Sequence, residues 1–223
     1  MPRPLLLYAL LCGLNVLHGG PASAAPYFAS GLIFPPEHWH NHGSSIVETP
    51  RGGLLVCWFH GSGERTADDV RILGARRPAG AERWSETFEM ADTPGFPDTN
   101  CAMFVDPDGR LWLLWPVILA NLWESALMRY RIASDFEGDG PPRWTANELL
   151  LVKPGPEFAA AVTHWLPQAE AALAAAADWP ARDREEARRY LDVLRDRATD
   201  KGYLRLGWMT RSRPFVLDGR RLI

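Results

Sequence analysis

Three histidines occupy alternate positions in residues 38–42 (HWHNH). On a β-strand, His38, His40 and His42 would face the same side, because successive side chains point to opposite faces. Three imidazoles at this spacing can bind a metal ion, hydrogen-bond a substrate or serve as structural histidines. Two preceding prolines disfavour a regular strand, and no carboxylate stands nearby in ligand spacing. We therefore predict that His40 and His42 bind substrate and that no metal or other cofactor is bound. A metal site on all three histidines is the alternative.

A second polar cluster, residues 60–69 (HGSGERTADD), lies in a glycine-rich stretch between two strand-like runs. It contains adjacent Asp68 and Asp69, with Arg65 three residues before them. Crowded carboxylates repel each other when both are ionised, which raises the pKa of one of them so that it can keep and donate a proton. The cluster therefore predicts general acid/base catalysis by Asp68 and Asp69, with a solvated acidic turn as the alternative.

The elements that must position these residues belong to an internal repeat. Residues 45–58, 102–115 and 214–223 each contain a strand-like run, a glycine turn and a second strand-like run. This order is typical of a β-hairpin. The turn glycines Gly52 and Gly109 stand 57 residues apart, which indicates a repeating unit of about that length.

A tryptophan marker repeats at nearly the same interval, since Trp84 and Trp144 are 60 residues apart. Another strand-like run precedes each marker, at residues 70–76 and 125–132. Each unit therefore has about four strands, which is typical of a β-propeller blade. We predict an all-β fold with about two blades and the start of a third, and a two-sheet sandwich is the alternative. Because a propeller needs at least about four blades and the repeat enters its second strand at Ile223, we expect a fragment of a longer propeller.

The repeat also predicts where the polar residues meet. Asp98 and Asn100, in residues 96–100, precede the second hairpin, and Arg211 precedes the third, just as residues 40–44 precede the first. Equivalent positions in successive blades lie at the same end of a propeller. We therefore expect Asp98, Asn100 and Arg211 to join the histidines in binding substrate.

The segment between the second and third hairpins predicts helices. Residues 157–200 are rich in Ala, Glu and Arg, and their apolar residues recur at helical spacing. Trp179-Pro180 interrupts this pattern, so we expect two helices. We interpret them as an insertion packed against the blades with solvated charged faces, and a partner-binding helix is the alternative.

The N-terminus is typical of a secretory signal peptide, with Arg3, an apolar run at residues 5–17 and the small-residue pattern of residues 22–24. We divide the chain into a signal peptide, residues 1–24, and a propeller segment, residues 25–223. The protein is then expected to be secreted or periplasmic without stable membrane insertion. An uncleaved anchor is the alternative.

Composition excludes several classes of protein. The net charge of −3 gives no electrostatic reason to bind nucleic acid, and 47% hydrophobic residues exclude wholesale disorder. Ten tryptophans suit a core or cleft lined with flat rings. After signal cleavage only Cys57 and Cys101 remain, in apolar runs where we expect buried free thiols.

Four segments, in this order, look like bacterial sialidase-like proteins with BNR/Asp-box repeats. They are residues 33–45 (IFPPEHWHNHGSS), 61–70 (GSGERTADDV), 93–100 (TPGFPDTN) and 206–211 (LGWMTR). The resemblance covers the predicted mature chain, but only the N-terminal half of such a protein. It implies a propeller of about six blades and exo-acting hydrolysis of terminal sialic acids, with a Tyr nucleophile assisted by a Glu.

Carried over by position, the resemblance implies roles for five residues. Arg65 would lie near the terminal sugar, and Asp68 or Asp69 would be the general acid/base. Asp98 would contact substrate, and Arg211 would clamp the sugar carboxylate.

The sequence also departs from that family. Residues 40–43 stand where sialidases carry Arg-Ile-Pro, residues 134–144 retain only a degraded Asp-box, and the Tyr nucleophile would lie beyond Ile223. We predict an exo-acting glycosidase of the sialidase type that acts on a glycan or sialoside, in a truncated copy whose activity is open. A non-catalytic carbohydrate-binding propeller is the alternative, and a metal-dependent hydrolase using the three histidines is the second.

Overall fold

The computed structural model describes residues 28–210, 214, 216–217 and 221–222. The chain divides into two units, Met1–Phe34 and Pro35–Ile223. Within the first unit, residues 28–34 form neither helix nor strand. The predicted signal peptide and Arg211 lie outside the described residues.

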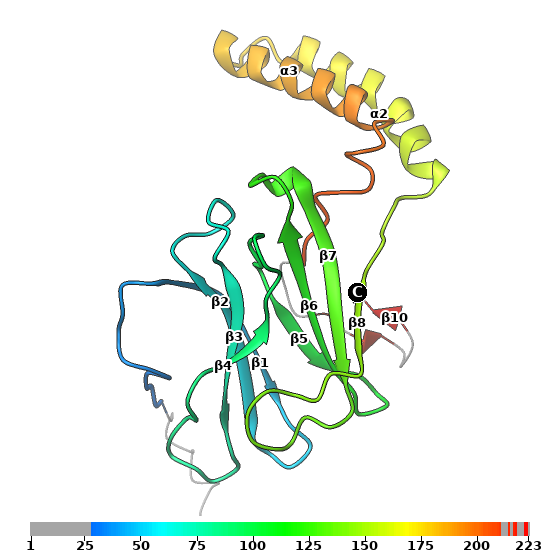
Figure 1. Ribbon diagram of the computed structural model, residues 1–223. Coiled ribbons are helices and arrows are strands. Elements are labelled where there is room, and N and C mark those ends of the chain that lie inside the picture. Colours follow the sequence, from blue (N-terminus) through cyan, green and yellow to red (C-terminus); the bar gives the residue numbers. More distant parts are fainter. Residues whose placement is uncertain (1–27, 211–213, 215, 218–220, 223) are drawn as a thin grey trace, which may run out of the picture. The chain divides into compact units, whose positions relative to one another are not determined.

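The second unit is mostly β-structure and contains two four-stranded antiparallel sheets, in which each strand pairs with the next along the chain (Figure 1). The first sheet consists of β1 (His40–Glu48), β2 (Leu54–Gly61), β3 (Arg71–Arg77) and β4 (Phe88–Ala91). The second consists of β5 (Ala102–Val105), β6 (Leu111–Ile118), β7 (Ala126–Ala133) and β8 (Ala146–Leu149). A two-stranded ladder of β9 (Val216–Leu217) and β10 (Arg221–Leu222) follows later in the chain. Within the described residues, neither four-stranded sheet closes into a barrel.

The predicted hairpins and tryptophan markers are confirmed for both sheets. Gly52 and Gly109 have φ angles of 78° and 76° in the β1–β2 and β5–β6 turns. Only glycine enters this region without steric cost, so these positions fix the turns. In the second turn, Asp106 accepts hydrogen bonds from the backbone N–H groups of Asp108 and Arg110. Trp84 and Trp144 each come shortly before the last strand of their sheet.

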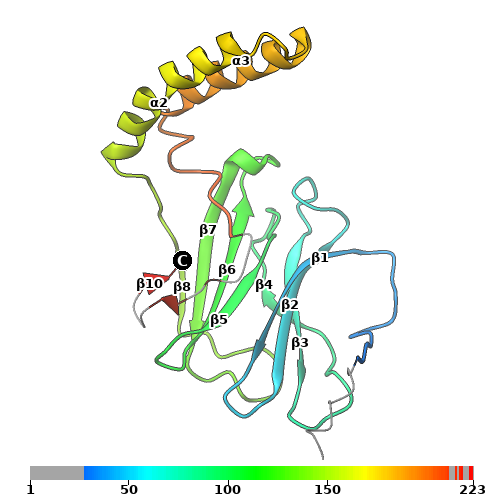
Figure 2. The ribbon, with the colours of Figure 1, turned by 180° about the vertical axis from the view of Figure 1, so that it is seen from behind.

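The two sheets pack against each other through one apolar core, and the first strands of the sheets, β1 and β5, are in contact (Figures 1 and 2). The largest fully buried side chain is Trp115 of β6. From the first sheet the core contains Val47, Leu55, Phe59, Ile72 and Met90, and from the second Met103, Leu111, Leu113, Trp115 and Val117. Neither sheet could bury this surface alone, so the two sheets depend on each other for a core.

The other face of the second sheet is also apolar. Phe104, Leu114 and Met128 are buried there, and the rings of Trp112 and Tyr130 pack against them. Trp112 stacks on Phe104 at 5.8 Å and on Tyr130 at 5.4 Å between ring centroids. Alternate residues of β6 therefore contribute to two separate apolar clusters.

Arg76 of β3 connects the two sheets at the end opposite the start of β1, where the β1–β2 turn lies. This guanidinium is buried and donates hydrogen bonds to the carbonyl oxygens of Phe136 and Gly140, in the β7–β8 connection. Arg51, in the β1–β2 turn, binds Glu137 of the same connection. Residues 134–144, in the β7–β8 connection, thus link the second sheet to the first at this end.

The predicted helices are α2 (Pro156–Ala175) and α3 (Ala181–Arg197), and they lie side by side as a hairpin (Figure 1). Their separation at Trp179-Pro180 confirms the predicted break. A proline at the first position of a helix loses no intrahelical hydrogen bond, which suits the start of α2 at Pro156. Leu166 and Leu191 are buried, and most other positions of both helices are exposed or half-buried. None of the helices in the described part is both long and apolar enough to span a bilayer.

The predicted free thiols lie together in the core. The Sγ atoms of Cys57 and Cys101 are 3.3 Å apart, and both residues are buried. Burial raises the pKa of the Cys57 thiol well above its ordinary value, and the neighbouring thiol of Cys101 raises it further.

In native, reduced protein we expect Cys57 to react with iodoacetamide at least about tenfold more slowly than in the urea-unfolded chain. Peptide mass spectrometry measures this, and equal labelling rates would contradict the burial.

Candidate functional site

Those polar residues singled out in the sequence that the structure describes gather at one end of the two sheets. In the β1–β2 register His40 pairs with Gly61, and in the β6–β7 register Ile118 pairs with Ala126. The loops between paired strands at this end cross-link the sheets, since Asn121 donates from Nδ2 to the Arg65 carbonyl oxygen at 2.9 Å. We call this end the mouth; it consists of residues 40–43, 62–69, 97–101, 119–125 and 207–210.

A β-bulge shapes the start of β1. His42 pairs with Phe59 and Ser45 with Cys57, so the strand contains one extra residue next to Gly43, whose φ is 60°. His40 and His42 lie on the same face, with ring centroids 5.6 Å apart. Both rings contact Phe59, at 5.5 and 5.4 Å.

His38 does not join this pair, so the predicted alternation over residues 38–42 is wrong at its first position. β1 begins at His40, after the two prolines, and the His38 ring packs against Trp39 at 4.8 Å. The neighbour that sequence spacing missed is Glu64, whose Oε1 lies 3.8 Å from His42 Nδ1. The β2–β3 loop returns Glu64 to β1, and only the three-dimensional fold reveals this contact.

The opposite face of β1 contains a polar network that sequence reasoning also missed. Asn41 Oδ1 accepts a hydrogen bond of 2.9 Å from Trp58 Nε1 and lies 2.9 Å from His60 Nδ1. Asn41 Nδ2 donates to Glu37 Oε1 at 2.9 Å. Burial lowers the pKa of His60, although the nearby carboxylate of Glu37 acts in the opposite direction. This network stabilises the start of β1 on the face opposite His40 and His42.

The sequence predicts a raised pKa for one of the two adjacent carboxyls of the acidic loop, and at Asp69 the shift has the opposite direction. Partial desolvation acts to raise the pKa of Asp69, but three hydrogen bonds from the hydroxyl and backbone N–H of Ser62 outweigh it and lower the pKa below its ordinary value. Asp69 is therefore ionised near neutral pH and anchors its own loop. Asp68 is exposed, and its Oδ1 accepts a hydrogen bond of 3.1 Å from Asn121 of the other sheet.

Asp98, which the sequence predicts to contact substrate, is not a surface residue. Its side chain is fully buried between the sheets, and Oδ1 accepts a hydrogen bond of 2.7 Å from Trp115 Nε1. Its backbone N–H bonds to the carbonyl oxygen of Val70. Burial raises the pKa of Asp98 to about 6, and the hydrogen bonds from Trp115 and Thr93 offset this only in part. Position in the repeat located the residue at the right end of the sheets but did not reveal that the opposite sheet covers it.

Asn100 lies at the mouth, half-buried, with a φ of 42° that asparagine tolerates better than most residues. Its carbonyl oxygen accepts a hydrogen bond of 3.1 Å from Thr210 Oγ1. Cys101 Sγ lies 3.4 Å from the carbonyl oxygen of Gly43. The start of β1, the segment before β5 and the segment that ends at Thr210 are therefore adjacent.

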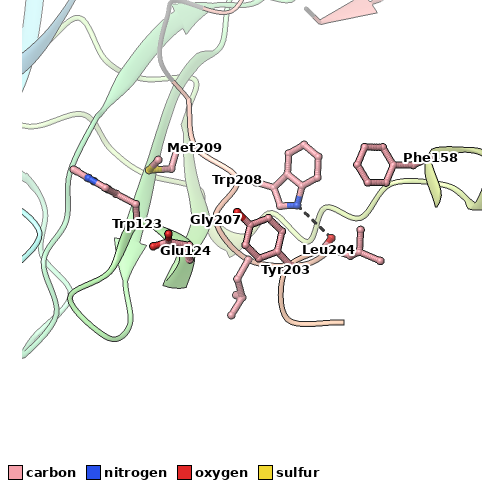
Figure 3. Close-up of a pocket in the computed structure, with 9 residues that line it drawn as sticks. Trp123, Glu124, Phe158, Tyr203, Leu204, Gly207, Trp208 and Met209 are labelled. Carbon is pink, nitrogen blue, oxygen red and sulfur yellow. Dashed lines mark hydrogen bonds between the residues drawn. The ribbon is translucent and has the colours of Figure 1, made fainter. Parts of the chain in front are cut away.

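An aromatic pocket borders the mouth (Figure 3). It has a volume of about 360 Å³ and is lined by Trp123, Glu124, Phe158, Tyr203, Leu204, Leu206, Gly207, Trp208 and Met209. Trp208 Nε1 donates to the Leu204 carbonyl oxygen at 3.2 Å. The Arg65 guanidinium lies 5.1 Å above the ring of Trp123, which connects the acidic loop to the pocket.

The acidic loop, residues 62–69, depends on a close approach between the backbone of Gly61 and that of Val70. A Cβ added there would lie 2.8 Å from Val70 Cα, a backbone atom that cannot rotate away. We expect Gly61→Ala to displace residues 62–69 and lower the free energy of unfolding by about 1–3 kcal/mol. Urea denaturation measures this, with Gly138→Ala as control because nothing lies within 4 Å of its added Cβ. Equal midpoints for the two variants would contradict the close contact.

Comparison of the sequence with family models and with curated proteins finds no match.

Proposed function

We propose that this chain is part of a six-bladed β-propeller of the sialidase type, an exo-acting glycosidase that binds an acidic sugar at the mouth. The two consecutive four-stranded sheets, with their first strands in contact, support a propeller arrangement. The resemblance described above supplies the sugar class. A secreted or periplasmic location and a glycan partner belong to the same proposal.

The observation that carries this proposal is the hydrogen bonding between the acidic loop and the second sheet. Asn121, in the β6–β7 loop, donates to the Arg65 carbonyl oxygen and to the Asp68 carboxylate, and the Arg65 guanidinium lies over the ring of Trp123. A cation and an exposed carboxylate therefore have defined positions at the mouth. A guanidinium can bind the carboxylate of an acidic sugar through two parallel hydrogen bonds. Asp68 is then the candidate general acid/base, and His40 and His42 are candidates to contact sugar hydroxyls. The proposal assigns no nucleophile within residues 1–223.

A calorimetric titration tests the acidic-sugar site. It measures the binding of N-acetylneuraminic acid to the tag-free chain with chelator present. We expect Arg65→Met to weaken binding at least about tenfold, because a charge-assisted hydrogen bond to the carboxylate is lost. Arg182→Met, on the exposed surface of α3, is the control and should leave the affinity unchanged. Absence of binding by the unaltered chain, or equal affinity of Arg65→Met, would contradict the proposal.

The second candidate is a non-catalytic carbohydrate-binding propeller, and the aromatic pocket favours it. Tyr203 and Trp208 are partly exposed in this pocket, with the ring of Trp123 nearby, and flat rings of this kind stack on sugar faces. This function predicts that a neutral sugar such as galactose binds, that Trp208→Ala abolishes its binding and that Arg65→Met does not. The same calorimetric series therefore separates the two candidates.

A further inference from the structure

We propose that His40, His42 and Glu64 form a binding site for a divalent transition-metal ion of the zinc type. The nearest ligand atoms of these three side chains all lie within 4.8 Å of one another. The site does not rest on the glycosidase proposal, which uses no metal ion.

The geometry needs only side-chain adjustment to reach coordination. Zinc binds histidine nitrogen and carboxylate oxygen at about 2.0–2.2 Å, so two ligand atoms of a tetrahedral site lie roughly 3.3–3.5 Å apart. The Nδ1 atom of His42 and Oε1 of Glu64 are already 3.8 Å apart. Both side chains have room to rotate, since they are 65% and 32% exposed.

The backbone keeps the three residues together without an ion. Two of them are on β1, two positions apart on one face, and the bulge at Gly43 follows directly. Phe59 of β2 packs against both imidazole rings and limits their motion. Glu64 enters from the β2–β3 loop, which the hydrogen bonds of Ser62 to Asp69 close on itself.

A buried nitrogen of His40 provides an independent observation. His40 Nε2 is shielded from solvent and has no hydrogen-bond partner among the described residues. A buried polar atom without a partner is unfavourable, so a ligand that can use this imidazole is favoured. Coordination at this nitrogen would break no existing hydrogen bond.

The donor set determines the kind of ion. Two imidazoles and one carboxylate suit zinc, cobalt, iron or manganese, whereas calcium and magnesium prefer sites made of oxygen ligands alone. Three protein ligands leave at least one coordination position for water or a substrate oxygen. Arg65 lies 3.8 Å from the other carboxylate oxygen of Glu64, so a cation already orients this ligand from outside.

Titration of tag-free, EDTA-treated and dialysed full chain with Zn²⁺ and Co²⁺ tests the site. We expect one ion per chain with a Kd on the order of micromolar or tighter, and Co²⁺ absorption bands typical of nitrogen and oxygen ligands. Glu64→Gln and His42→Ala should each weaken binding at least about tenfold. Both positions are partly solvent-exposed, and thermal unfolding of each variant checks that the fold is retained.

The matched controls are His38→Ala, next to the site but on the segment before β1, and His164→Ala, on the exposed surface of α2. Neither should change the affinity. The proposal is overturned if the chain binds no ion, if Glu64→Gln and His42→Ala bind as tightly as the unaltered chain, or if a control variant loses binding equally. Because sugar binding is measured with chelator present, either proposal can fail while the other stands.

Discussion

Replacement of Trp115 by alanine is expected to lower the free energy of unfolding by about 3–5 kcal/mol, the usual cost of removing a large buried aromatic side chain. Trp115 is the largest fully buried side chain of the core between the two sheets. The guanidinium groups of Arg129 and Arg131 lie 5.5 and 5.6 Å from its ring, so the substitution also removes two cation–π contacts. Urea denaturation followed by circular dichroism measures the change.

Trp115→Phe separates packing from hydrogen bonding. Phenylalanine keeps most of the apolar contact but lacks the Nε1–H group that donates to Asp98. We expect this variant to lose less stability than Trp115→Ala, by at least about 1 kcal/mol. A loss below about 1 kcal/mol for Trp115→Ala would mean that the two sheets do not share the core described here.

The second large effect is a dependence of stability on pH caused by Asp98. Its pKa is about 6 in the folded protein, against an ordinary value of 3.8, because burial disfavours the charged form. The folded state thus holds the proton more tightly than the unfolded state. The contribution of Asp98 to stability is fully present below about pH 4 and is lost as the pH rises through 6. The total loss corresponds to about 3 kcal/mol.

Asp98→Asn removes this titration while keeping an oxygen that can accept the hydrogen bond from Trp115. We expect the variant to be more stable than the unaltered chain at pH 7.5 and no more stable at pH 4. Arg131 and Asp92 also act on this carboxyl electrostatically, so the comparison must be made between variants at each pH. Denaturation midpoints from pH 4 to 8 measure the effect, with exposed Asp178→Asn as control. Parallel profiles for all three proteins would contradict the shifted pKa.

The parts of the fold that sequence reasoning predicted are those with local signals. Gly52 and Gly109 mark their turns because the backbone conformation there strongly favours glycine. Pro180 directly precedes α3, where a missing N–H costs no intrahelical hydrogen bond, whereas Pro167 lies inside α2 and does not end it. The candidate site depended on contacts between distant segments, which local signals do not encode. Burial of Asp98 is caused by the opposite sheet, and Glu64 reaches His42 only because the loop folds back.

The two apolar faces of the second sheet have a mechanical consequence. Leu113 and Trp115 of β6 belong to the core shared with the first sheet, whereas Leu114 between them belongs to the cluster with Phe104 and Met128. Both clusters therefore depend on the position of a single backbone segment. A substitution that shifts β6 to relieve packing on one face is therefore expected to disturb the packing on the other face as well.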